Sequence, residues 1–178
     1  MHSVCVYLSS SSGRPVDVAA TTALAHEIVR RDLTLVYGGA RRGLMGVLAD
    51  ATLEAGGRVV GVIPQALVER EIAHHSVTEL HIVSTMHERK AKMFELADGF
   101  VVAPGGLGTI EEAFEHLTGL YLGYHRKPIV FLDIEDFWRR FEAFLDHAVE
   151  VSVLRPVARA LIRTVSSASA ALDALAVW

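Results

Sequence analysis

Short apolar runs alternate along the chain with longer segments whose apolar residues recur three and four positions apart. The short runs predict buried strands at Val4–Leu8, Leu33–Tyr37, Arg58–Ile63, Thr78–Val83, Gly99–Ala103 and Ile129–Leu132, with a weaker strand near Leu161–Val165. The longer segments predict helices at Val16–Arg31, Gly43–Ala55, Thr85–Ala97, Gly108–Leu122, Phe137–Val151 and Ser167–Val177, the last capped by Ser166 or Ser167. This alternation predicts an α/β fold with a parallel, doubly wound sheet.

Length and composition fit a single domain spanning 1–178. Of the 178 residues, 51% are hydrophobic and 21% charged, and the net charge is −4, which excludes a disordered chain and a polycationic nucleic-acid binder. Glycine or a charged or polar residue interrupts every long apolar run, so we expect no membrane-spanning helix. The start MHSVCVYL does not resemble a signal peptide, and one cysteine cannot form an intrachain disulfide, so we expect a cytoplasmic protein.

Two glycine-rich loops each follow a predicted strand and precede a predicted helix, where open α/β sheets bind ligands. In the first, Gly105, Gly106 and Gly108 leave the backbone bare of side chains, and Thr109 adds a hydroxyl. The helix dipole supplies partial positive charge at the same point. The loop therefore predicts a phosphate site, with a tight turn that binds no ligand as the alternative.

The second loop, Tyr37–Gly46, carries four glycines beside Arg41 and Arg42. Neither loop has the spacing of a P-loop or of a dinucleotide fingerprint, which disfavours a P-loop NTPase and an NAD dehydrogenase. The arginine pair either supplies positive charge to a ligand or belongs to a solvated surface.

Charged residues occupy two notable helix positions. Arg89 falls inside the apolar stripe that contains Met86 and Met93, so it is either a snorkelling or ion-paired structural residue or a clamp for an anion. Glu111 and Glu112 lie in the first turn of the glycine-loop helix, where acidic residues often only complement the dipole. Beside a bound sugar phosphate, a carboxylate there would stabilise an oxocarbenium-like transition state.

Three segments carry recognisable motifs: PGGLGTIEE at 104–112, MHERK at 86–90, and the loop Tyr37–Gly46. They resemble the PGGxGTxxE, MHERK and YGGGxxGLMG signatures of the LOG (Lonely Guy) family, once widely mislabelled as lysine decarboxylases, and the likeness covers essentially the whole chain. The resemblance implies a Rossmann-like homodimer that hydrolyses the N-glycosidic bond of cytokinin riboside 5′-monophosphates. The products are a free N6-substituted adenine and ribose 5-phosphate, and several relatives also act on AMP.

Carried over residue by residue, the resemblance assigns Arg89 and Glu112 to the catalytic pair. It assigns Gly105, Gly106, Gly108 and Thr109 to the phosphate loop. Further implied substrate-binding positions are Glu71, Lys90, Leu107, Ile110, Glu111 and Thr118. In the implied mechanism Glu112 counters positive charge at C1′ and orients water, Arg89 holds substrate or Glu112, and neither metal nor cofactor is needed.

The sequence departs from the family pattern at two places. Ala40 stands where the family usually has a third glycine, and Leu8-Ser9-Ser10-Ser11 replaces Cys-Gly-Ser-Ser. An extra methyl at Ala40 could narrow the pocket or demand a negative φ. These departures bear on substrate preference and rate more than on reaction type.

Metal and covalent chemistry are weaker interpretations. Four of the nine histidines lie close in sequence: His74, His75, His81 and His87. The H-E-x-x-H motif is absent and Cys5 has no cysteine partner, so a metal site is disfavoured. Cys5 is expected in the core rather than as a nucleophile. Nothing around Lys90 or Lys92 points to a pyridoxal Schiff base.

A helical-spacing stripe of Trp138, Phe141, Phe144 and Leu145 predicts either core packing or a dimer interface, and the resemblance favours a dimer. The alternative function is a non-hydrolytic nucleotide-binding sensor or carrier of the same fold, which the presence of both Arg89 and Glu112 disfavours. A general nucleoside monophosphate nucleosidase stays open, because base selectivity depends on pocket shape.

Overall fold

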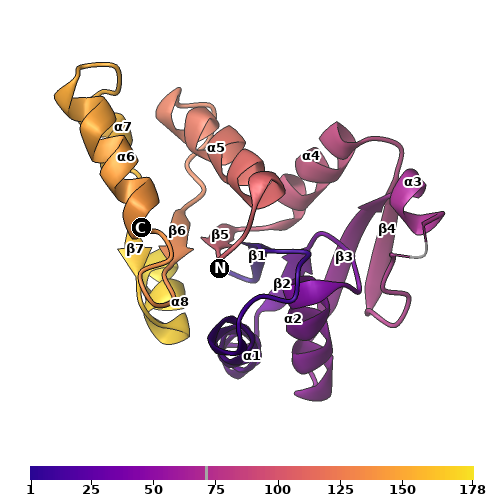
Figure 1. The fold of residues 1–178 in the computed structure, drawn as a ribbon. Helices are drawn as coiled ribbons and strands as arrows, with labels where there is room; N and C mark the ends of the chain where they lie inside the picture. The colour runs from indigo at the N-terminus through magenta and orange to yellow at the C-terminus, as the bar shows by residue number, and fades with distance from the viewer. Residues whose placement is uncertain (71) are drawn as a thin grey trace.

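Seven parallel strands form one sheet over residues 1–70 and 72–178, which are the residues that the computed structural model describes (Figure 1). The strand order is β4-β3-β2-β1-β5-β6-β7. The strands are β1 Ser3–Tyr7, β2 Thr34–Tyr37, β3 Val59–Pro64, β4 Glu79–Val83, β5 Gly99–Val102, β6 Ile129–Leu132 and β7 Thr164–Val165. The helices are α1 Pro15–Arg30, α2 Gly43–Glu54, α3 Gln65–Val68, α4 Met86–Leu96, α5 Leu107–Tyr121, α6 Arg139–Glu150, α7 Pro156–Arg159 and α8 Ala168–Ala176.

The predicted parallel, doubly wound fold is confirmed, and the predicted strands and helices are present with ends shifted by a few residues. The two short helices α3 and α7 were not predicted, because four residues are too few to show a helical period. Ser167 is the cap of α8, since its hydroxyl accepts a hydrogen bond from the N–H of Ala170 at 3.2 Å. The prediction that 78–83 is a buried strand was wrong: β4 pairs only with β3 and forms an edge of the sheet, so its side chains are partly or fully exposed.

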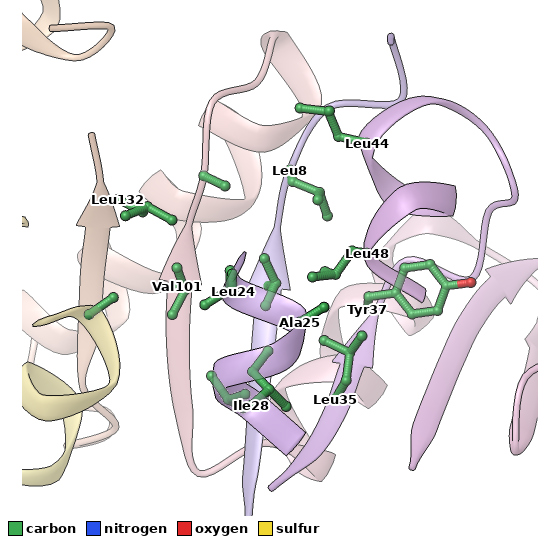
Figure 2. Close-up of a cluster of buried hydrophobic side chains, with 14 of the residues drawn as sticks. Leu8, Leu24, Ala25, Ile28, Leu35, Tyr37, Leu44, Leu48, Val101 and Leu132 are labelled. Atoms are coloured by element: carbon green, nitrogen blue, oxygen red, sulfur yellow. The ribbon is translucent and has the colours of Figure 1, made fainter. Parts of the chain in front are cut away.

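Side chains alternate between the two faces of the sheet and form two hydrophobic clusters. On β1, Val4 and Val6 face the cluster covered by α1, α2 and α8, whereas Cys5 and Tyr7 face the one beneath α4, α5 and α6 (Figure 1). Figure 2 shows the first cluster, with Leu24 and Ile28 of α1 packed against the strands. Cys5 is fully buried, as predicted for a core residue, and burial raises its thiol pKa.

The aromatic stripe after β6 belongs mostly to the core. Trp138 and Leu145 are buried in the second cluster, and the Trp138 indole N–H donates to the carbonyl oxygen of Leu132 at 3.2 Å. Phe144, in contrast, is 63% exposed.

The helix side changes between β1 and β5, the two central strands. The chain leaves β1 for α1 on one face and leaves β5 for α5 on the other, so the loops after these strands diverge (Figure 1). They remain in contact, because the N–H of Ser9 donates to the carbonyl oxygen of Pro104 at 3.2 Å. Such a switch point is where open α/β sheets place ligands. Among the described residues, no helix has both the length and the hydropathy to cross a membrane.

Candidate active site

A cavity of about 390 Å³ opens at the carboxyl edge of the sheet, beside the switch point. Its walls include the serine loop Ser9–Ser11 after β1, the loop after β2, and the first turns of α4 and α5. Arg89 and Glu112 both line it, as does the glycine loop before α5. Segments far apart in the sequence thus meet in one concave site, of a volume suited to a small-molecule ligand.

The predicted phosphate loop forms the N-terminal end of α5. Gly106 is the N-cap residue, and no side chain caps the helix, so its first N–H groups depend on solvent or a ligand. A Cβ at Gly105 would lie 2.1 Å from Oγ1 of the buried Thr109, so glycine is required there. A Cβ at Gly106 or Gly108 would meet no atom within 4 Å, which leaves the backbone open on that side. This geometry is suited to an anion.

The second glycine loop serves packing. The N–H groups of Leu44 and Met45, at the start of α2, donate to the carbonyl oxygens of Ser11 and Ser9 at 3.1 and 3.3 Å. Gly43 has a φ of +59°, and a Cβ there would lie 2.3 Å from a carbonyl oxygen of the serine loop. The N-terminus of α2 therefore holds the serine loop in place, which is how this loop contributes to the cavity.

The arginine pair and the departure at Ala40 lie beside the cavity. Arg41 and Arg42 are both exposed, and Arg42 lines the cavity. The N–H of Arg41 donates to the carbonyl oxygen of Ile72 at 2.8 Å. Ala40 is buried and forms an isolated bridge with Ala73, and its φ is not positive, so its methyl group requires no strained backbone.

Arg89 is anchored to β3 and to the residue that follows β2. The residue is only 6% exposed; its Nε donates to the carbonyl oxygen of Val62 at 3.2 Å, and its Nη2 donates to that of Gly38 at 3.1 Å. Its Nη1 lies 3.9 Å from Oε1 of Glu112. A Cβ at Gly38 would lie 1.7 Å from Nη2, so the glycine makes room for the guanidinium. The interpretation as a snorkelling side chain was wrong, because the charge lies inside the site and faces a carboxylate.

Glu112 lies one helical turn beyond Thr109 and is 5% exposed. Burial raises the pKa of its carboxyl group to about 7, against the opposing effect of the Arg89 cation and with a further upward contribution from Glu111. The carboxyl group therefore changes its charge near neutral pH. A carboxyl group with such a pKa, in a cavity and opposite a fixed cation, is typical of a functional residue.

The remaining predicted positions divide between the cavity and its surroundings. Glu111 and Leu107 line the cavity, and Leu107 is 89% exposed at its mouth. Ile110 packs against the second hydrophobic cluster. Lys90 and Thr118 line not the cavity but a groove between α4 and α5, which adjoins it because Glu112 lines both.

Lys90 spans from α4 to α5, where its ammonium contacts the carboxylates of Glu111 and Glu115. These hydrogen bonds, that to Glu111 first, raise its pKa. The predicted position Glu71 lies outside the described residues.

The clustered histidines do not converge. His74 is buried and its Nε2 lies 2.9 Å from Asp50, while Nε2 of His81 lies 2.9 Å from Glu79. Within residues 1–70 and 72–178, no three His, Cys, Asp or Glu side chains are grouped as a metal site would require. Sequence reasoning assigned no role to Leu67, which lines the cavity. The serine loop also lines it, and the sequence had linked this loop to substrate preference only through its departure from the family pattern.

Comparison with known proteins identifies the family. A family model described as "Possible lysine decarboxylase" matches residues 45–175. The cytokinin riboside 5′-monophosphate phosphoribohydrolase of Rhodococcoides fascians is 43% identical, over 97% of this chain and 88% of that protein. The chain belongs to the LOG family. The LOG-family relative of the same enzyme name from Arabidopsis thaliana is 42% identical, over 93% of this chain and 78% of its own length.

Solved structures of low sequence identity share the fold. The molybdenum cofactor binding protein of Rippkaea orientalis superposes with a TM-score of 0.70 at 16% identity, over 97% of this chain and 94% of that one. The molybdenum cofactor carrier protein of Chlamydomonas reinhardtii gives a TM-score of 0.68 at 16% identity over the full length of both. Proteins of other names thus share the Rossmann-like architecture of this LOG-family chain. At such low sequence identity the similarity concerns the fold alone.

Proposed function

We propose that this LOG-family protein hydrolyses the N-glycosidic bond of cytokinin riboside 5′-monophosphates, releasing an N6-substituted adenine and ribose 5-phosphate. The observation that carries the proposal is the buried Arg89–Glu112 pair, one helical turn from an uncapped glycine loop and in the same cavity. Relatives more than 40% identical over nearly the whole chain bear the name of this activity.

The site orders the parts of a nucleotide along α5. The 5′-phosphate binds at Gly106, Gly108 and Thr109, where backbone N–H groups and the helix dipole favour an anion. Glu112 follows Thr109 by three residues, a rise of about 4.5 Å along the helix axis. A ribose attached to the bound phosphate is thereby placed beside the carboxyl group of Glu112.

Glu112 acts in its ionised form. As the bond from C1′ to the base lengthens, positive charge develops on the sugar, and a buried carboxylate stabilises it more strongly than water would. Arg89 keeps that carboxylate in place, since two backbone carbonyl groups fix the guanidinium that faces it. The ionised carboxylate also orients the attacking water.

The base lies against the apolar part of the cavity, which includes Leu67, Ile72 and Met86. This wall offers contact area to a purine ring and to an apolar N6 substituent. AMP is a second substrate in this scheme, because phosphate and ribose make the same contacts and only the N6 contacts are lost.

The two lysines of α4, Lys90 and Lys92, offer no support for a decarboxylase that forms a Schiff base. Such a lysine requires a lowered pKa, whereas the carboxylates of Glu111 and Glu115 raise the pKa of Lys90. Lys92 pairs with Glu95 at 3.0 Å on the outside of α4. Lysine decarboxylation, the activity for which the family model is named, therefore finds no support in these two lysines.

A product assay tests the proposal. Purified protein is incubated separately with isopentenyladenosine monophosphate, AMP and isopentenyladenosine, and free base and ribose 5-phosphate are followed by chromatography. We expect base release from the monophosphates and not from the riboside. Binding of the monophosphates with no release from any substrate would refute hydrolysis and favour the sensor or carrier alternative.

We also infer that the protein is a homodimer. Exposed apolar side chains lie on α5, on α6, in the segment after α6 and on α7: Phe114, Tyr121, Phe144, Val153 and Val157. A hollow of about 280 Å³ lies among them, with Thr118 in its wall. In a dimer through this surface, the substrate contact that the resemblance implies for Thr118 would be made across the interface. Light scattering should give twice 19.4 kDa, and a 19.4 kDa species alone would refute the dimer.

A further inference from the structure

Lys127 follows α5 in the sequence but binds the end of α4. Its Nζ donates to the carbonyl oxygens of Phe94 and Ala97 at 2.6 and 2.7 Å, and it lies 4.4 Å from the centre of the Phe94 ring. The last carbonyl groups of a helix lack partners within the helix, and a cation there also complements the dipole. Lys127 therefore forms the C-terminal cap of α4, supplied from a different part of the chain.

The same residue is tied to the middle of α5. The Nε2 of His116 lies 3.0 Å from the carbonyl oxygen of Lys127, and the Nε2 of His125 lies 3.1 Å from that of His116. Burial lowers the pKa of His116 to about 4, so at neutral pH its ring is uncharged and donates through Nε2. His116 lies one helical turn beyond Glu112.

A groove lies between α4 and α5, so the contacts made by Lys127 and Lys90 help to hold the two helices together. Its volume is about 540 Å³, and it separates the two helices along most of their facing sides. Lys90 bridges it at the cavity end through Glu111 and Glu115, and Lys127 bridges the other end. The Arg89–Glu112 pair spans the same two helices at 3.9 Å.

We propose that Lys127 is a positioning residue for the proposed hydrolysis, because it holds the end of α4 against α5 and thereby sets the distance between the Arg89 guanidinium and the Glu112 carboxylate. Without the ammonium group, the segment that contacts His116, and with it the middle of α5, is less firmly held against α4, so Glu112 shifts relative to the fixed Arg89 guanidinium. A catalytic group displaced by about 1 Å loses up to about a hundredfold in rate. The phosphate loop lies at the start of α5, far from this cap, and is unaffected.

The test compares Lys127→Met with Lys92→Met, which removes a lysine of α4 whose ion pair stays within that helix. Lys127→Met should lower kcat between about tenfold and a hundredfold while KM for isopentenyladenosine monophosphate changes less than about twofold. Lys127→Arg, which keeps two donors and the contact with the ring, should recover most of kcat. Lys92→Met should leave both parameters unchanged.

The pH profile separates positioning from a general loss of stability. Glu112 is faced by Arg89 and Lys90 from α4 and by Glu111 and Glu115 on its own helix. Weaker contact with Arg89 raises the Glu112 pKa, so the acid limb of kcat/KM in Lys127→Met should move to higher pH. If Lys127→Met keeps the kcat of the wild type and the acid limb of its pH profile does not move, the proposal is overturned, even if the variant has a lower Tm. If Lys127→Met does not fold, Lys127→Gln, which retains a shorter donor, takes its place.

This inference rests on the proposed function, and the two can fail separately. Absence of base release by the wild-type protein refutes the hydrolase alone. The Glu112 pKa is then obtained without turnover, from the pH dependence of unfolding. The difference between Glu112 and Glu112→Gln is measured once in the wild-type background and once in the Lys127→Met background. An unchanged Glu112 pKa there refutes the positioning role of Lys127.

Discussion

Replacing Glu112 by Gln should make the protein more stable at high pH while abolishing its activity. Burial raises the carboxyl pKa from its ordinary value of 4.5 to about 7, so the folded chain binds this proton more tightly than the unfolded chain does. Its contribution to stability is therefore complete below pH 4.5 and is lost as pH rises through about 7. The neutral amide that Glu112→Gln introduces would resemble the protonated acid at every pH and avoid this loss.

The size of the effect follows from the two pKa values. At about 1.36 kcal/mol per pKa unit, the difference between 4.5 and about 7 corresponds to roughly 3 kcal/mol of unfolding free energy above pH 8. For a chain of this length, each kcal/mol raises Tm by about 2–4 °C, so the gain amounts to roughly 6–12 °C. Near pH 4.5 the variant and the wild type should unfold almost alike, apart from a constant offset.

Urea unfolding at a series of pH values from 4.5 to 8.5 measures this difference directly. Glu54→Gln, an exposed residue at the end of α2, is the matched control and should show no pH-dependent difference from the wild type. A stability difference between Glu112→Gln and wild type that stays flat across the series would refute the argument. It would mean that the Glu112 carboxylate is not destabilised by its surroundings, and the electrostatic basis of the site would be lost.

Three further predictions concern catalysis. Gly38→Ala would place a methyl group against the Arg89 guanidinium and should lower kcat about a hundredfold in the base-release assay. An unchanged kcat would contradict the role given to the contact between Arg89 and Gly38. Thr109→Val removes the buried hydroxyl of the phosphate loop. It should raise KM for the monophosphate about tenfold, because one hydrogen bond to a charged group is lost, and an unchanged KM would mean that the phosphate binds elsewhere. In wild-type protein, kcat/KM should rise with pH through about 7 as Glu112 ionises, and a profile that falls over that range would assign Glu112 the role of an acid.

The sequence was sufficient for the fold because strand and helix periods are local signals. The runs that became β1, β5 and β6 are apolar on both faces, as is typical of strands in the interior of a parallel sheet. The edge position of β4 was missed, although Glu79 and His81 interrupt its apolar residues in the way that charged side chains often mark edge strands. Helices α3 and α7 have four residues each, too few to repeat the helical period that would reveal them.

The site was predicted where a motif and a helix terminus coincide. Gly105, Thr109 and Glu112 lie on one loop and one helix, so their proximity follows from local geometry. The surroundings of Arg89 could not be predicted, since its partners are backbone carbonyl groups of β3 and of the loop after β2, and any residue type carries those. The role of Lys127 was hidden for the same reason: it acts on the carbonyl oxygens of a helix about thirty residues earlier.

One comparison tests the central claim most directly, namely that Glu112 performs glycosidic hydrolysis on a nucleotide held by its phosphate. Wild type and Glu112→Gln are mixed in parallel with isopentenyladenosine monophosphate at pH 8, and free base is measured over time while binding is measured by calorimetry. We expect that both proteins bind the nucleotide and that the variant releases base about a hundredfold to a thousandfold more slowly, because it lacks a central electrostatic contact. Equal rates of release by the two proteins would contradict the role of Glu112.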